Sequence, residues 1–314
     1  MLSRTADHLF WMARYMERAE NTARMLAVNY QMSLLPQSDE VAERGWRGLL
    51  SISELTGDFA KRHGPVTPKS VIDYMVSDAA NGSSIRSCLM QARENARAVR
   101  GTLTTEVWET QNQTWLEFQR MVADDAFQKS PGEAFEWVKF RSHLSRGVTV
   151  GTMLQDEAFH FLRIGSFLER ADNTARLLDV KYHLLLPANE QVGGSLDFFQ
   201  WVAILRAVSA ATAYHWVYRD RVKPWLVADL LILKLAMPRS LIYCYDALDR
   251  ALGDLARIDG ASGAAQRQAR AVLSKLERAS MTEIFQGGLH EFVTEFIEEN
   301  GRLANAISEQ YLFV

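Results

Sequence analysis

The sequence predicts an all-α protein made of two pseudo-equivalent helical units that form one elongated or pseudo-twofold helical bundle. Apolar residues recur at steps of three and four, and strict alternation of apolar and polar residues is almost absent. The segment ERAENTAR at 17–24 returns as ERADNTAR at 169–176, which indicates an internal repeat. Hydrophobic residues make up 48% of the 314 residues, enough to bury a sizeable core.

The repeat extends well beyond this motif. At the offset of 152 residues that joins Glu17 to Glu169, residues of the first half match the second half at Leu2, Ala6, His8, Val28 and Tyr30. Further along the chain the offset grows to 155 or 156, and the matching residues become Trp46, Pro68, Asp73, Ser84 and Cys88 with Trp201, Pro224, Asp229, Ser240 and Cys244. We therefore predict a duplicated chain, with a first helical unit over 1–150 and a second over 151–314.

Helix boundaries in the first unit follow from capping residues. Thr67 before Pro68 and Ser84 before Ile85 are N-cap signals, while Asn81-Gly82 is typical of a helix end. The run Ser130-Pro131-Gly132-Glu133 has the arrangement of a capping box with proline at the first helical position. The expected helices span 4–34, 39–62, 68–80, 84–101, 104–124 and 131–150.

The second unit is expected to repeat this order of helices. Pro224 and Ser240 stand where Pro68 and Ser84 stand in the first unit. The expected helices span 153–186, 196–218, 224–237, 239–257, 263–279 and 287–311.

The composition argues against several classes of protein. A net charge of -3 gives no overall basic field to attract nucleic acid or anionic lipid, and the aromatic residues are not interleaved with basic ones. The most apolar stretch, 225–237, is too short to span a bilayer and is interrupted by Asp229 and Lys234. With two cysteines and no secretory signal, the chain is expected to be cytoplasmic, with no nucleic acid and no membrane among its partners.

The repeated motif places charged residues on one face of each helix. At 100° per residue, Glu17, Glu20, Asn21 and Arg24 lie together, and alanines and larger apolar residues occupy the other side. The second copy keeps the same face with Glu169, Asp172, Asn173 and Arg176. The spacing allows the ion pairs Glu20–Arg24 and Asp172–Arg176.

Two interpretations of this polar face remain open. The helices can meet near a pseudo-twofold axis, where the face forms a buried, fully hydrogen-bonded network. Alternatively, the face is a site for a charged ligand, in which Glu17 and Glu169 are the candidate catalytic groups. The candidate binding residues of the motif copies are then Arg18, Glu20, Asn21, Arg24, Arg170, Asp172, Asn173 and Arg176.

The repeated motif, together with the stretch from Ser83 to Arg97, resembles the bacterial alpha-E domain family, which is named for its helices and its Glu-Arg motif. The resemblance covers essentially the whole chain. Members of that family are typically encoded beside, or fused to, a circularly permuted ATP-grasp protein and a transglutaminase-like protein. The resemblance thus implies these two partners and a place in a peptide-forming or peptide-tagging system.

A second set of arginines occurs only in the first unit. Arg86, Arg93, Arg97 and Arg100 fall on one face of the helix expected over 84–101, whereas the second unit has Ile242, Asp249, Gly253 and Ala256 at those positions. The arginines can form a solvated face, can pair with Glu17, Glu20 or Glu106, or can form an anion-binding groove for a phosphate, an acyl-phosphate or an acidic peptide.

The remaining residues suggest no cofactor and no metal. His8 and His160 lie about 180° from the glutamate of their own helix, so one helix cannot direct both groups to one ion. Cys88 and Cys244 are expected to pack in the core, and the sequence has no phosphate loop or dinucleotide-binding glycine pattern.

These patterns favour a helical partner or binding module of an ATP-grasp-linked peptide-forming or peptide-tagging system. Such a module would bind an anionic small molecule or peptide, or the ligase itself, through its Glu, Arg and Asn faces. The alternative is an enzyme of the same pathway in which Glu17 or Glu169 is the acid–base group and arginines hold the anion. A carboxylate beside arginines normally has a lowered pKa, which favours the binding module.

Overall fold

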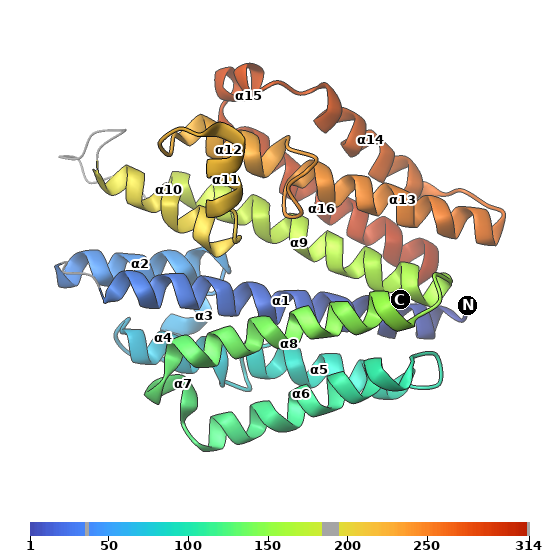
Figure 1. The fold of residues 1–314 in the computed structure, drawn as a ribbon, viewed down its shortest axis with the longest axis horizontal. Helices are drawn as coiled ribbons and strands as arrows, with labels where there is room; N and C mark the ends of the chain where they lie inside the picture. Colours follow the sequence, from blue (N-terminus) through green and yellow to red (C-terminus); the bar gives the residue numbers. More distant parts are fainter. Residues whose placement is uncertain (35–37, 184–194, 313–314) are drawn as a thin grey trace.

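A computed structural model describes residues 1–34, 38–183 and 195–312. These residues form helices throughout, with no strand among them, so the predicted all-α class is confirmed. Figure 1 shows the first half of the chain and the second half packed side by side. The helices of the first half are α1 (Ser3–Ser33), α2 (Asp39–Ile52), α3 (Thr56–Arg62), α4 (Pro68–Val76), α5 (Ile85–Ala98), α6 (Thr105–Ala123), α7 (Ala126–Lys129) and α8 (Pro131–Thr152). Those of the second half are α9 (Glu157–His183), α10 (Ser195–Ala207), α11 (Ala211–Tyr218), α12 (Pro224–Ile232), α13 (Leu241–Asp259), α14 (Ala264–Arg278), α15 (Met281–Gly287) and α16 (Leu289–Tyr311).

Two helices expected to be continuous are each broken in two. The helix expected over 39–62 is interrupted between α2 and α3, and the helix expected over 196–218 is interrupted between α10 and α11. Both interruptions contain a non-glycine residue in the left-handed region, Glu54 at φ 56° and Ser209 at φ 54°. The short helices α7 and α15 were not expected, and the predicted end at 186 lies outside the described residues.

The capping predictions have mixed outcomes. The Thr67 side chain accepts a hydrogen bond from the Ser70 amide, and the Ser84 side chain accepts one from the Ser87 amide, so both predicted helix starts are confirmed. The predicted capping box at Ser130 is wrong, because Ser130 makes no side-chain cap hydrogen bond. Ser130 is also the residue at which α7 ends, and its backbone has φ -139° and ψ 64°. The sequence signal that starts α8 is therefore Pro131 alone.

The long helices α1 and α9 lie next to each other at the centre of the molecule (Figure 1). Helices α5 and α8 pack on α1, and α13 and α16 pack on α9. The buried apolar residues of both halves form one continuous cluster. The predicted boundary at residue 150 therefore does not separate two cores, because one apolar core contains residues from both sides of it.

Gly165 permits the close approach of α1 and α9. A Cβ atom at this position would lie 2.3 Å from the backbone oxygen of Phe10 and 3.2 Å from the Cβ of Ala13. Ala13 and Gly165 are themselves 152 positions apart, the offset of the repeated motif. Two small residues at matching positions thus let the central helices touch, and this contact brings the polar faces of both helices together.

No helix among the described residues is long and apolar enough to cross a bilayer.

Candidate functional site

The two Glu-Arg dipeptides of the repeated motif bind each other across the α1–α9 contact. Arg170 donates to both oxygens of Glu17 at 3.0 and 2.8 Å. Arg18 donates to both oxygens of Glu169 at 2.6 and 3.1 Å. Each glutamate is therefore held by the arginine of the other copy in a two-point ion pair, the strongest common geometry for a carboxylate and a guanidinium.

A buried network surrounds the first of these pairs. Glu17 and Glu20 are 1% and 0% exposed, so neither carboxylate is solvated. Arg239, which directly precedes the N-cap residue of α13, donates to Glu17 at 3.0 Å, to Glu20 at 2.6 Å and to the Oδ1 of Asn21 at 3.1 Å. Further contacts to the two glutamates come from Arg24, Ser142, His143, Arg146 and Arg170.

The arginines keep both buried carboxylates ionised. Burial raises the pKa of Glu17, but the charges of Arg170 and Arg239 outweigh it and lower that pKa to about 2. Burial likewise opposes ionisation of Glu20, yet its hydrogen bond with His143 and the charges of Arg239 and Arg146 hold the pKa of Glu20 well below its ordinary value. A group that is ionised at neutral pH cannot donate a proton there, so neither glutamate suits general acid catalysis.

The second pair has a similar but smaller set of partners. Glu169 is 6% exposed and also accepts from the Nε of Arg14 at 2.8 Å. Its pKa is lowered, because the charges of Arg14 and Arg18 outweigh the effect of burial. Asp172 pairs with Arg176 at 2.7 Å, and burial raises the pKa of this aspartate.

Arg24 and Arg176 connect each motif to the broken helix of the opposite half. Arg24 pairs with Glu20 at 2.7 Å and Arg176 with Asp172, so both predicted i,i+4 ion pairs are present. Arg24 also donates to the Ser209 hydroxyl at 2.5 Å, and Arg176 donates to Glu54 at 2.5 Å. The acceptors are thus the two left-handed residues at the interruptions of α10–α11 and α2–α3.

The predicted motif residues divide between two cavities. We call the first the ER cavity; it has a volume of about 220 Å³ and is lined by Arg18, Asn21, Glu169, Asp172, Asn173 and Arg176, together with Ser83 and Glu54. We call the second the arginine cavity; it has a volume of about 170 Å³ and is lined by Glu17, Arg146, Arg163 and Arg170, with the hydroxyl residues Ser142, Ser145, Thr149, Ser166 and Tyr243. Glu20 and Arg24 line neither of them, and Arg24 borders a third cavity with Ser209.

The arginine cavity has an excess of positive charge. Three of its lining residues are arginines and one, Glu17, is a carboxylate. Arg163 stacks on Phe167, with 4.6 Å from its guanidinium carbon to the ring centre, and forms no ion pair or hydrogen bond with any described residue. Burial lowers the pKa of Arg163, and the neighbouring charges of Arg170 and Arg250 act in the same direction. Among the described residues, no ion pair therefore balances the charge of Arg163.

Several residues of the network were missed by the sequence analysis. Arg146 and Arg239 lie on or beside helices that do not carry the repeated motif, so no local signal identifies them. Arg14 could have been found, because it lies on α1 four residues before Arg18 and so on the same face of the helix. Arg163 could have been found, because it precedes Arg170 by seven residues and so lies on the same face of one helix.

Three of the four arginines of the first unit, Arg86, Arg93 and Arg97, lie on one helix as expected, and Arg100 does not. Helix α5 ends at Ala98, so Arg100 lies beyond it, while Arg86 and Arg97 are exposed. Arg93 and Arg97 both pair with Glu94, at 2.5 and 2.7 Å, and Arg93 also donates to Asn112. Of the three alternatives for these arginines, pairing with Glu17, Glu20 or Glu106 is contradicted. Arginines of α1, α8 and α9, with Arg239, contact Glu17 and Glu20, and no ion pair of Glu106 is found with a described residue.

The two cysteines are packed in the core, and His8 and His160 lie beside polar side chains. Cys88 and Cys244 are fully buried, and burial raises the pKa of each thiol to about 12. His8 hydrogen-bonds Asn95 at 2.7 Å, and His160 lies 3.7 Å from Asp254. Among the residues that the structure describes, no three His, Cys, Asp or Glu side chains are grouped so that they could hold a metal ion.

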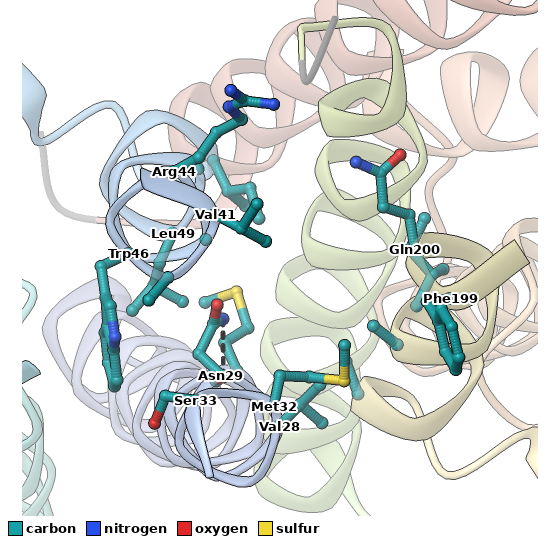
Figure 2. Close-up of a pocket in the computed structure, with 18 of the residues that line it drawn as sticks. Val28, Asn29, Met32, Ser33, Val41, Arg44, Trp46, Leu49, Phe199 and Gln200 are labelled. Carbon is teal, nitrogen blue, oxygen red and sulfur yellow. Dashed lines mark hydrogen bonds between the residues drawn. The ribbon is translucent and has the colours of Figure 1, made fainter. Parts of the chain in front are cut away.

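A separate apolar cavity of about 150 Å³ lies between α1, α2, α9 and α10. Figure 2 shows Trp46 and Leu49 on one side of it and Phe199 and Gln200 on the other, with Val28 and Met32 between them. Nothing in the sequence analysis indicated this cavity, because its walls come from helices far apart in the chain.

Comparisons with known proteins identify a family that has a Glu-Arg motif. A family model called Alpha-E, described as a predicted alpha-helical domain with a conserved ER motif, matches residues 1–312. Uncharacterized proteins of Mycobacterium bovis and of two Mycobacterium tuberculosis strains are 26% identical to the chain over 329 residues. These matches cover 94% of the chain and 35% of the mycobacterial proteins, so the chain spans about a third of their length. No solved structure matches the chain.

Since the family model covers nearly every residue, the chain belongs to the Alpha-E family.

Proposed function

We propose that this chain is a binding module whose arginine cavity takes an anionic group, either a carboxylate or a phosphate. The observation that carries the proposal is Arg163, which lines the cavity without an anionic partner among the described residues. A half-buried guanidinium without a counter-ion is unfavourable, and an anion entering the cavity would correct this.

The donors around the cavity fit an oxyanion. Every hydrogen bond that Arg146 makes to Glu17, Glu20 and Ser142 comes from its Nη1 atom, which leaves Nε and Nη2 for a ligand. The hydroxyls of Ser166 and Tyr243 line the same cavity and form no hydrogen bond with the described residues. Guanidinium forks and hydroxyls are the side-chain donors that commonly recognise carboxylate and phosphate oxygens.

The charge of the surrounding network supports the same ligand class. Glu17 and Glu20 are two negative charges, and the four arginines that contact them are Arg24, Arg146, Arg170 and Arg239. Arg163 adds a further positive charge at the cavity. An anion would therefore reduce the repulsion among buried cations as well as fill the site.

The pathway is part of the proposal. The family resemblance implies a circularly permuted ATP-grasp protein and a transglutaminase-like protein as partners, in a peptide-forming or peptide-tagging system. In that setting the anion would be the carboxylate of an acidic peptide or an acyl-phosphate. The module would present this group to the ligase. The enzymatic alternative is less favoured, because the pKa values of Glu17 and Glu169, its proposed acid–base groups, are both lowered.

Titration calorimetry with inorganic phosphate, pyrophosphate and triglutamate tests the anion site. We expect at least one of these probes to bind, and we expect Arg163→Gln to weaken that binding by about tenfold or more, since a charged hydrogen bond is lost. Arg120→Gln, at an exposed position on α6, is the matched control and should bind as the wild type does. Equal affinity of the Arg163→Gln variant, or no binding of any probe at millimolar concentration, would refute the proposal.

Co-purification tests the partner. Tagged protein expressed at its native level should bring down an ATP-grasp protein that mass spectrometry can identify. Recovery of the folded chain without such a protein, including after mild cross-linking, would count against the ligase as a stable partner.

A further inference from the structure

The ER cavity lies beside α9 at the position that corresponds to the one filled by the Arg239 side chain beside α1. Arg239 reaches three acceptors of α1, namely Glu17, Glu20 and Asn21. The residues 152 positions later, Glu169, Asp172 and Asn173, all line the ER cavity. The same three kinds of acceptor are thus present on α9, but they face a cavity.

The residue that corresponds to Arg239 is Ser83. Arg239 directly precedes Ser240, the N-cap of α13, and Ser83 directly precedes Ser84, the N-cap of α5. Both cap hydroxyls accept from the amide three residues later, and both donate at 2.8 Å to the carbonyl six residues earlier. Because the two turns have the same hydrogen bonds, the preceding residues project alike, and Ser83 lines the ER cavity.

The acceptors of the ER cavity have fewer cationic partners than those around Arg239. Glu20 is contacted by Arg24, Arg146 and Arg239, whereas Asp172 is contacted by Arg176 alone among the described residues. Consistent with this difference, the pKa of Asp172 is raised by its burial. No ion pair or hydrogen bond of Asn173 is found with any described residue, although Asn173 lines the cavity.

A buried donor also faces this space without a partner. Asn21 is 3% exposed and lines the ER cavity, and its Nδ2 atom has no hydrogen-bond partner among the residues that the structure describes. The orientation of this amide is fixed, because its Oδ1 atom accepts from Arg239 and a guanidinium can only donate. An unpaired buried donor is costly, so a ligand that occupies the cavity should offer it an oxygen.

We infer that the ER cavity binds a guanidinium group, placed against Glu169, Asp172 and Asn173 as Arg239 is placed against Glu17, Glu20 and Asn21. A carbonyl or carboxylate oxygen of the same ligand accepts from the Nδ2 of Asn21. The guanidinium belongs either to free arginine or to an arginine side chain of a peptide. This inference uses a different cavity and a ligand group of opposite charge from the proposed anion site.

A guanidinium fits these acceptors better than an ammonium does. The planar fork of a guanidinium can donate to two carboxylates and an amide oxygen at once, as Arg239 does. An ammonium is a compact charge that is more strongly hydrated and lacks this fixed geometry. Recognition should therefore distinguish arginine from lysine.

Calorimetry or ligand-observed NMR with Nα-acetyl-arginine amide tests the inference on the full chain. We expect this probe to bind at least about tenfold more tightly than the matching lysine compound. Ser83→Arg should abolish binding, because the new side chain occupies the cavity as Arg239 occupies the other side. Gln113→Arg, which adds the same charge at an exposed position on α6, should leave binding unchanged.

Asp172→Asn gives an independent variant if Ser83→Arg does not fold. It removes a carboxylate without changing the size of the side chain and should weaken binding by about tenfold. Free arginine and an arginine-containing tripeptide, titrated in parallel, distinguish the two sources by their relative affinity.

The inference is overturned if no guanidinium probe binds at millimolar concentration, if lysine and arginine compounds bind equally, or if folded Ser83→Arg and Asp172→Asn both bind as the wild type does. Phosphate binding by Ser83→Arg should be unaffected, so failure here is separable from failure of the anion site.

Discussion

Glu169 is buried, and its counter-ions are two arginines of α1, Arg14 and Arg18. Replacing it with glutamine leaves Arg14 and Arg18 without a counter-ion. Breaking a buried ion pair in this way costs about 3–5 kcal/mol of unfolding free energy. We expect Glu169→Gln to lose stability in that range, measured by urea unfolding at pH 7.

An exposed glutamate provides the comparison for this substitution. Glu136 is 62% exposed and pairs with Lys139 on the surface of α8. Glu136→Gln should change the unfolding free energy by less than about 1 kcal/mol, because exposed ion pairs contribute little. A Glu169→Gln protein as stable as wild type would contradict the buried network.

At the residue scale, the sequence predicted the motif but only part of its surroundings. The i,i+4 pairs of Arg24 and Arg176 follow from helical spacing, and both are present. The crossed pairing of Glu17 with Arg170 depends on how two helices pack, and Arg239 reaches the network from a turn before α13. Such long-range contacts leave no periodic signal in one sequence.

At the scale of elements, the close contact of α1 with α9 depends on the missing side chain of Gly165. Alanine usually stabilises a helix relative to glycine by about 1 kcal/mol. Here its Cβ would meet the Phe10 carbonyl at 2.3 Å, and forced repacking of a core typically costs about 1–3 kcal/mol. We expect Gly165→Ala to lower the unfolding free energy, as measured by urea or thermal unfolding.

Gly253 supplies the matched control within α13. A Cβ at Gly253 meets nothing within 4 Å, so Gly253→Ala should show the ordinary helix gain of about 1 kcal/mol. If Gly165→Ala lowers the unfolding free energy and Gly253→Ala raises it, the contact of α1 with α9 is the cause of the loss at Gly165. A stabilising effect at both positions would mean that α1 and α9 can separate at little cost.

The helix interruptions show why element boundaries were only partly predictable. Glu54 and Ser209 have left-handed backbones although neither is glycine, so local sequence gave no reason to end a helix there. Arg176 donates to Glu54 and Arg24 donates to Ser209 from the opposite half. The contacts at each break thus come from residues more than a hundred positions away. The starts at Thr67 and Ser84 depend on adjacent residues and were predictable.

At the scale of the whole molecule, stability should fall steeply in acid. The pKa of Glu17 is about 2 against an ordinary value of 4.5, and those of Glu20 and Glu169 are also lowered. The unfolded chain therefore takes up protons before the folded chain does, so these groups stabilise the fold above about pH 4.5. That contribution is lost as the pH falls from 4.5 toward 2.

Urea midpoints measured between pH 7 and pH 2.5 test this expectation. Asp7, Asp172 and Asp249 act in the opposite direction, because burial raises their pKa values. Glu17, Glu20 and Glu169 should outweigh them, because each of these glutamates is paired with at least two arginines. The midpoint should stay nearly constant down to about pH 5 and then fall, with the same profile in the Glu136→Gln control. A midpoint independent of pH over the acid range would show that the three glutamates are not held ionised by the fold.

The all-α class was predictable because periodicity and capping act locally along the chain. A single bundle was also expected, but the contact that joins both halves was not predictable, because it depends on the small residues Ala13 and Gly165 on two distant helices. The duplication remains a prediction, supported by the corresponding positions of Glu17 with Glu169 and Arg18 with Arg170.

The crossed pairs have a consequence for how such a chain can change over generations. Suppose that an ancestral half-length polypeptide formed a symmetric dimer. One Glu-Arg dipeptide would then have made both contacts, because each subunit would supply the arginine for the glutamate of the other. After fusion, Glu17 depends on Arg170 and Glu169 on Arg18, as two separate contacts in one gene. Each pair should therefore co-vary among related sequences, while the two pairs are free to diverge from one another.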